Sequence, residues 1–149
     1  INAMKVAKHH HCFLGTNKEG QISYVKTKGN PNCHLILRGG STGPNFDPIT
    51  IQSYSKELID SDLSGKIMID CSHGNSNKQH SNQPSVFNNV MYQRRNGSDA
   101  ILGVMLESNL YEGNQSIPEN LSDLEYGVSV TDECMSWETT ADIIRKAFQ

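Results

Sequence analysis

The chain has 149 residues, of which 36% are hydrophobic and 19% charged, and its formal net charge is −3. This length suffices for one hydrophobic core, and the weak negative charge argues against a nucleic-acid-binding surface. No apolar run approaches the roughly 20 residues of a membrane-spanning helix, no signal peptide is visible, and the four cysteines form no CxxC pair. We therefore expect a cytoplasmic protein with reduced thiols and neither a nucleic-acid nor a membrane partner.

Residues 1–8 read as the end of a helix, and the chain begins at Ile1 rather than at a methionine. The sequence is therefore expected to be either the back half of a larger domain or a piece that starts at an expression boundary. Residues 12–15 and 22–27 predict two strands of a β-hairpin, because a polar, glycine-containing turn lies between them.

Three short, mainly apolar runs follow, at residues 34–38, 66–72 and 101–106. A polar side chain lies at the carboxyl end of each run or directly after it. Arg38, His73 and Glu107 mark these ends, 35 and 34 residues apart. Because a strand, a helix and two loops take about 30 residues or more, the spacing predicts a parallel βαβαβ arrangement. The three polar side chains would then meet at one rim of the sheet, where such folds keep their chemistry.

Capping signals place the helices between and after these strands. Asp47 followed by a proline predicts a helix start, and a second helix is expected to begin near Gln83 and to end at residues 96–97. For the last helix we expect a capping box formed by Thr139 and Asp142.

His73, Glu107 and Asp132 are candidate ligands of a divalent metal. One histidine and two carboxylates suit manganese, iron, cobalt or zinc. The alternative is that all three are ordinary loop residues. Arg38 has two interpretations: its planar guanidinium could hold a phosphate or a carboxylate, or it could form a surface ion pair.

Two other groups of residues have suitable chemistry but unsuitable context. Residues 9–12 combine three histidines with a cysteine, and Cys33 and His34 follow, but their spacing matches no zinc module. Cys71 precedes His73 by two residues, but no orienting partner for a cysteine nucleophile can be identified. We therefore expect Cys71 to be a buried core residue.

Several motifs, spread over most of the chain, resemble the type I 3-deoxy-D-arabino-heptulosonate 7-phosphate (DAHP) synthases. The motifs are HLILRGG (34–40), GPNF (43–46), MIDCSHGNSNK (68–78), ILGVMLESNL (101–110), EGNQ (112–115), YGVSVTD (126–132) and WETT (137–140). The resemblance implies an α/β fold in which residues 1–149 form the C-terminal part of one TIM-type (β/α)8 barrel domain, with an inserted hairpin at about residues 12–27.

The family's enzymes are transferases that condense phosphoenolpyruvate with erythrose 4-phosphate, the first step of the shikimate pathway towards chorismate and the aromatic amino acids. The resemblance implies that Arg38 binds the phosphoenolpyruvate phosphate, that His73, Glu107 and Asp132 are metal ligands, and that His73 and Asp132 also lie at the substrate. It also implies a homo-oligomer.

The family's fourth metal ligand, a cysteine on an early strand, and its Lys-Pro-Arg-Thr loop for erythrose 4-phosphate have no match in this chain. We therefore expect the 149-residue chain alone to be inactive. Two alternatives remain open at this point. The chain could be a non-catalytic truncated half-barrel, or part of a related phosphoenolpyruvate-dependent sugar-phosphate synthase.

In this family the hairpin insertion helps to form a feedback site for an aromatic amino acid. Phe13, Gly15 and Val25 match positions that line it. Members with glycine at the position of Gly15 tend to respond to tyrosine, and members with serine to phenylalanine. The resemblance therefore favours tyrosine as the effector, although the hairpin could instead only cover the barrel's end or pack a subunit interface.

Overall fold

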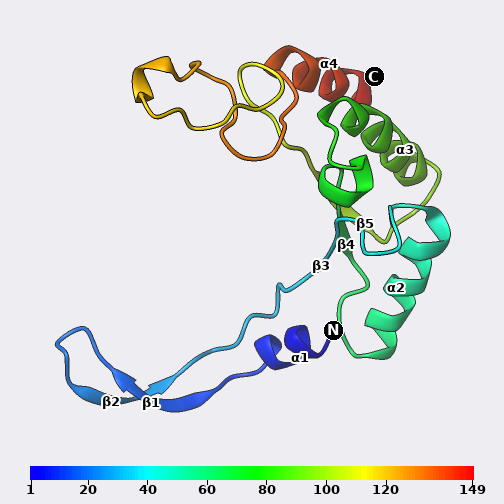
Figure 1. Cartoon of the computed structure of the whole chain (residues 1–149). Coiled ribbons are helices and arrows are strands. Elements are labelled where there is room, and N and C mark those ends of the chain that lie inside the picture. Colours follow the sequence, from blue (N-terminus) through cyan, green and yellow to red (C-terminus); the bar gives the residue numbers. More distant parts are fainter.

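The computed structural model describes residues 1–149 and places a three-stranded parallel sheet beside helices, with an antiparallel hairpin extending away from them (Figure 1). The elements in chain order are α1 (Asn2–Lys8), β1 (Cys12–Thr16), β2 (Ile22–Lys26), β3 (Leu35–Leu37), α2 (Pro48–Asp60), β4 (Ile67–Asp70), α3 (Gln83–Arg95), β5 (Ile101–Met105) and α4 (Trp137–Ala147). Short 3-10 turns span His73–Ser76, His80–Asn82 and Leu121–Asp123. No helix has the length and apolar character needed to cross a membrane.

The parallel sheet has the strand order β3-β4-β5, with α2 and α3 as the crossover connections. The predicted βαβαβ arrangement is therefore confirmed. Helices α2, α3 and α4 lie along one side of the sheet in Figure 1. The sheet ends at β3 on one edge and at β5 on the other, so its three strands do not close into a barrel within this chain.

The hydrophobic core lies between the sheet and these helices. Ile67 and Ile69 of β4 are fully buried, as are Leu58 of α2 and Val90 of α3. Burying such a side chain contributes about 1.5–3 kcal/mol, so these contacts fix the strands against the helices. Because the core holds the strands in place, it also fixes their carboxyl ends, beside which the site residues lie.

The start of α2 follows the prediction. Asp47 is the N-cap, its side chain accepts a hydrogen bond from the Thr50 N–H at 2.9 Å, and Pro48 occupies the first helical position. A proline is tolerated there because its missing N–H would have no helical partner. The beginning of α3 at Gln83 is confirmed as well.

The expected capping box of the last helix is wrong. Helix α4 begins at Trp137, and its N-cap is Ser136, whose hydroxyl accepts a hydrogen bond from the Thr139 N–H at 3.2 Å. Thr139 therefore lies inside the first turn, and Asp142 instead pairs with Lys146 one turn further on. The serine lies three residues before Thr139, which is the spacing that a capping hydroxyl needs.

The predicted hairpin is present. Strands β1 and β2 pair antiparallel, with Phe13 opposite Val25 and Gly15 opposite Ser23. The hairpin projects away from the parallel sheet in Figure 1, and its residues Leu14 and Ile22 are exposed.

Candidate metal centre

The loop after β4 begins with a tight backbone turn that rests on the loop after β3. The Gly74 N–H donates to the Arg38 carbonyl at 3.0 Å. A Cβ added at Gly39, whose φ is +82°, would lie 2.5 Å from the Gly74 carbonyl carbon, so a glycine is required at position 39 for this close approach. His73 itself adopts a left-handed φ of +50°, which is uncommon outside glycine.

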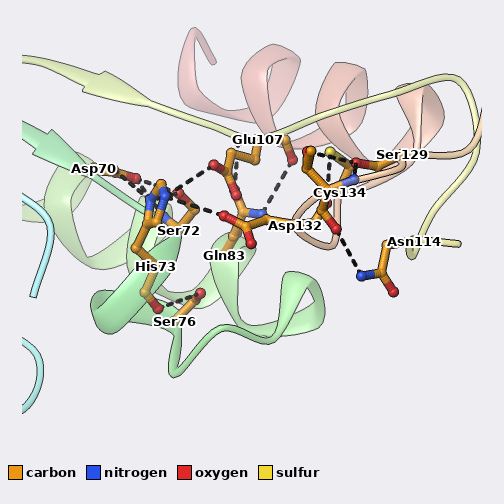
Figure 2. A network of polar contacts seen from close by, with 11 residues as sticks. Asp70, Ser72, His73, Ser76, Gln83, Glu107, Asn114, Ser129, Asp132 and Cys134 are labelled. Carbon is orange, nitrogen blue, oxygen red and sulfur yellow. Dashed lines mark hydrogen bonds and ion pairs between the residues drawn. The ribbon is translucent and has the colours of Figure 1, made fainter. Parts of the chain in front are cut away.

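His73, Glu107 and Asp132 come together from three separate loops (Figure 2). The Nε2 atom of His73 lies 3.4 Å from Glu107 Oε1 and 3.5 Å from Asp132 Oδ2. One ligand atom from each of the three residues lies within 4.8 Å of the other two. Glu107 follows β5, whereas Asp132 lies in the long connection between β5 and α4.

The hydrogen bonding of the imidazole leaves Nε2 facing the two carboxylates. The other ring nitrogen, Nδ1, lies 2.9 Å from Asp70 Oδ2, and a carboxylate only accepts hydrogen bonds. Nδ1 therefore carries the proton in the neutral ring, and the lone pair of Nε2 points towards Glu107 and Asp132. Three electron-rich atoms then converge, an arrangement that a cation would stabilise, and a nitrogen with two carboxylate oxygens suits a divalent transition metal.

The Asp132 loop is tied to the end of β5 by backbone bonds. The Met135 N–H donates to the Glu107 carbonyl at 3.0 Å, and the Asn109 N–H donates to the Met135 carbonyl at 2.9 Å. A side-chain hydrogen bond also holds the loop, because Glu133 Oε2 lies 2.9 Å from His80 Nδ1. Hydrogen bonding to His80 lowers the pKa of Glu133, so this carboxylate is ionised at neutral pH.

The three side chains line a cavity of about 210 Å³ whose walls contain no hydrophobic residue. Lys78 and His80 contribute the other positively charged or protonatable groups of this wall. Arg38 does not line the cavity: its side chain is exposed, and it approaches the site only through its backbone carbonyl. The structure therefore brings together the three candidate metal ligands, whereas the side chain of Arg38, which was expected at the same rim, stays outside the cavity.

Several residues of the site could not be recognised as such from the sequence: Asp70, Lys78, His80, Gln83 and Glu133. Of these, Asp70 left a usable signal, since a buried strand that ends in an aspartate three residues before a histidine places two polar groups at one turn. The others lie in loops or at a helix start, and nothing in the local pattern relates them to Glu107 or Asp132.

The cysteines and the other histidines form no second centre. Cys71 is fully buried, as expected, and burial raises the pKa of its thiol to about 12, with Asp70 adding to the effect. It is therefore un-ionised near neutral pH and unsuited to nucleophilic attack. The group formed by His73, Glu107 and Asp132 is the one set of three or more histidine, cysteine or acidic side chains in the chain that could share an ion, and residues 9–12 do not contribute to it.

The three candidate effector-site residues lie together on the hairpin. Phe13 and Val25 are opposite each other, and a Cβ added at Gly15 would lie 3.0 Å from Val25 Cγ2 and 3.3 Å from Phe13 Cε2. A side chain at position 15 would therefore press against two apolar neighbours, Phe13 and Val25, and the glycine avoids this contact.

The fold and the site together define the class of protein: an α/β protein with a candidate metal centre beside the carboxyl ends of parallel strands. The model of the DAHP synthetase I family matches residues 1–145, and the chain therefore belongs to this family.

Relatives agree along the whole sequence. The chain is 46% identical over 149 residues to the Tyr-sensitive phospho-2-dehydro-3-deoxyheptonate aldolase of Escherichia coli (strain K12), covering 100% of this chain and 42% of that protein. It is 45% identical over 150 residues to the phenylalanine-inhibited enzyme of Saccharomyces cerevisiae, covering 97% of this chain and 40% of that protein.

A solved structure gives the same result. The phospho-2-dehydro-3-deoxyheptonate aldolase of Francisella tularensis superimposes with a TM-score of 0.89 at 45% identity, over 98% of this chain and 42% of that one. The chain thus spans about 40% of the length of the curated relatives described here.

Proposed function

We propose that the full-length protein is a DAHP synthase, which condenses phosphoenolpyruvate with erythrose 4-phosphate and releases phosphate. The observation that carries the proposal is the convergence of His73, Glu107 and Asp132 at the strand ends, within a chain that is 46% identical throughout to a named phospho-2-dehydro-3-deoxyheptonate aldolase.

His73 Nε2 and one oxygen each from Glu107 and Asp132 would hold a divalent metal, and the mixed nitrogen and oxygen set fits manganese, iron, cobalt or zinc. When bound, such an ion supplies Lewis acidity that polarises the aldehyde oxygen of erythrose 4-phosphate. Two carboxylates offset the charge of the ion, so the centre as a whole stays close to neutral. Asp132 and His73, which line the open cavity, would also face the substrates.

Arg38 would bind the phosphate of phosphoenolpyruvate. Its side chain is exposed beside the loop that carries His73 and takes part in no ion pair, so its guanidinium is available to an anion. A guanidinium donates two parallel, charge-assisted hydrogen bonds to a phosphate, which holds the group that leaves on C–O cleavage. In the 149-residue chain this side chain lies outside the cavity, so we propose that the rest of the protein completes the phosphate pocket around it.

We further propose that the three βα units are the C-terminal part of a (β/α)8 barrel. Helices cover one face of the three strands, and the sheet ends at β3 and β5, as a section cut from a closed barrel would. The remaining part would supply a fourth metal ligand and the pocket for the second phosphate. The chain alone is then inactive, and the complete protein would assemble as a homo-oligomer.

We propose tyrosine as a feedback effector of the complete protein. The relatives include proteins named Tyr-sensitive and tyrosine-inhibited as well as one named phenylalanine-inhibited. Gly15 has no side chain between Phe13 and Val25, so the space that a serine side chain would take there would stay free for the tyrosine hydroxyl.

The test compares three proteins: the full-length enzyme, its His73→Ala variant and the isolated 149-residue chain. Consumption of phosphoenolpyruvate that depends on both erythrose 4-phosphate and a divalent metal is expected for the full-length enzyme alone. Metal content, measured by mass spectrometry of the metal after dialysis, should fall in His73→Ala together with turnover. A full-length protein that uses another sugar phosphate in preference to erythrose 4-phosphate would favour the related synthase class, and wild-type metal content in His73→Ala would remove His73 from the site.

A further inference from the structure

We propose that Asp70 is the positioning residue of the metal centre, which holds His73 in one tautomer and one orientation so that Nε2 is the atom presented to a cation. The inference rests on the proposed function in taking His73 as a ligand, but its structural part concerns residues of this chain alone. It derives from a chain of short polar contacts at the end of β4, drawn in Figure 2.

The carboxylate of Asp70 is 2% exposed and receives donors on both oxygens. Its Oδ2 lies 2.9 Å from His73 Nδ1, while its Oδ1 accepts from the Ser72 N–H at 2.9 Å and from the Ser72 hydroxyl at 2.5 Å. The Ser72 Oγ also lies 2.7 Å from His73 Nδ1.

One assignment of protons satisfies all these contacts. The serine hydroxyl donates to Oδ1, so its oxygen is left as an acceptor, and Nδ1–H of His73 is shared between that oxygen and Oδ2 of Asp70. The neutral ring then carries no proton on Nε2. A metal ligand of this kind needs such a lone pair, and a second hydrogen bond from the opposite nitrogen is how proteins usually fix it.

Asp70 can orient the ring because its own position is rigid. It is the last residue of β4, and its carbonyl accepts a hydrogen bond at 2.8 Å from the side chain of Asn75, which also donates to the Leu37 carbonyl at 3.1 Å. Asn75 is itself buried. The aspartate therefore belongs to the strand scaffold, whereas His73 lies in the turn beyond it, in a left-handed conformation that is uncommon for residues other than glycine.

A purely structural role would use Asp70 only to accept from the Ser72 N–H, closing the turn after β4. The substitution Asp70→Asn separates the two roles. The asparagine oxygen can still accept from Ser72, and the side chain has nearly the same volume. Its amide group, however, donates towards His73 Nδ1, which moves the ring proton to Nε2 and aims it at Glu107 and Asp132.

The experiment uses metal-free full-length protein with ¹⁵N-labelled histidine, in the wild type, in Asp70→Asn and in the control Asp142→Asn. The control removes an equal charge from an exposed pair with Lys146 on α4. Long-range ¹H–¹⁵N spectra at a pH where imidazoles are neutral report the tautomer of His73, whose signals are identified by their absence in His73→Gln. Cobalt(II), titrated into each protein and followed by its visible absorption bands, reports the affinity of the centre.

We expect a proton on Nδ1 in the wild type and in Asp142→Asn, a proton on Nε2 in Asp70→Asn, and cobalt affinity about 10- to 100-fold weaker in Asp70→Asn alone. A proton on Nε2 in the wild type would by itself overturn the inference. The inference can therefore be tested even if Asp70→Asn fails to fold. Equal tautomers and equal cobalt affinities in wild type and Asp70→Asn overturn it as well. If the wild type shows the Nδ1 tautomer but binds no cobalt, the result contradicts the proposed metal site. It still supports the inference that Asp70 orients the His73 ring.

Discussion

Gln83 binds both backbone polar groups of Glu107. Its Nε2 donates to the Glu107 carbonyl at 3.2 Å, and its Oε1 accepts from the Glu107 N–H at 2.9 Å. The glutamine is the first residue of α3 and is 1% exposed. The start of a helix thereby fixes the backbone from which the Glu107 carboxylate projects into the cavity.

Replacing this glutamine by methionine should destabilise the protein and weaken metal binding. The Gln83→Met side chain fills a similar volume but leaves the N–H of Glu107 without its partner, and an unsatisfied buried polar group costs about 1–3 kcal/mol. Urea denaturation should show a loss of this size, and cobalt affinity should fall because the backbone of Glu107 is no longer held. Gln52→Met, on the exposed face of α2, is the matched control and should change neither quantity. Wild-type stability in Gln83→Met would mean that the two hydrogen bonds contribute nothing net.

The cap of α2 should make a pH-dependent contribution to stability. Hydrogen bonds from Thr50, chiefly that of its side chain, lower the pKa of Asp47. A carboxyl group with a depressed folded-state pKa stabilises the native state above its ordinary pKa of about 3.9, and this contribution disappears as the pH falls through the folded-state value.

Asp47→Ala should therefore lose about 1 kcal/mol at neutral pH, the usual value of an N-cap side chain. Urea denaturation at a series of pH values should show the difference between wild type and Asp47→Ala shrinking as the pH is lowered below about 4. Asp47→Ser, which keeps a capping oxygen without a charge, should retain most of the neutral-pH stability. A difference that grows on acidification would contradict the assignment.

The buried thiol of Cys71 should be inert in the native protein. Its pKa of about 12 keeps it protonated near neutral pH, and the thiolate is the form that reacts with alkylating reagents. Iodoacetamide at neutral pH should label Cys12, which is exposed, and should leave Cys71 unmodified until the protein is denatured. Peptide mass spectrometry before and after unfolding measures both. Labelling of native Cys71 as fast as that of Cys12 would show that the core around β4 opens readily.

The sequence predicts the scaffold of the site better than its supporting contacts. His73 and Glu107 could be placed because each follows a short apolar run, and the spacing of such runs defines parallel strands whose ends must meet. Gln83 was recognised only as a helix start, since a hydrogen bond to a backbone 24 residues away leaves no local pattern. Ser136 was missed as a cap for a related reason: Thr139 and Asp142 formed an equally plausible motif, and only the fold decides where the helix begins.

Arg38 shows a further limit of strand-end reasoning. Its backbone lies where the sequence places it, in contact with the loop that carries His73, but its side chain does not enter the cavity lined by the other three residues. The direction of a long, exposed side chain depends on the partners that surround it, and a pattern of apolar residues carries no information about those partners.

The last prediction concerns the choice of effector. A serine at position 15 would place its Cβ 3.0 Å from Val25 Cγ2 and 3.3 Å from Phe13 Cε2, so the hairpin side chains must shift and the space that the glycine leaves free is partly filled. Gly15→Ser in the full-length enzyme should therefore weaken inhibition by tyrosine relative to phenylalanine. A phenolic hydroxyl buried without a partner costs about 1–3 kcal/mol, so the ratio of the two inhibition constants should change by about 5- to 150-fold. Thr16→Ser, one residue along the same strand, is the control and should leave the ratio unchanged. Titration of both amino acids against initial rates decides the matter: an unchanged ratio in Gly15→Ser, or a wild type that phenylalanine inhibits more strongly than tyrosine, removes Gly15 from the explanation of specificity.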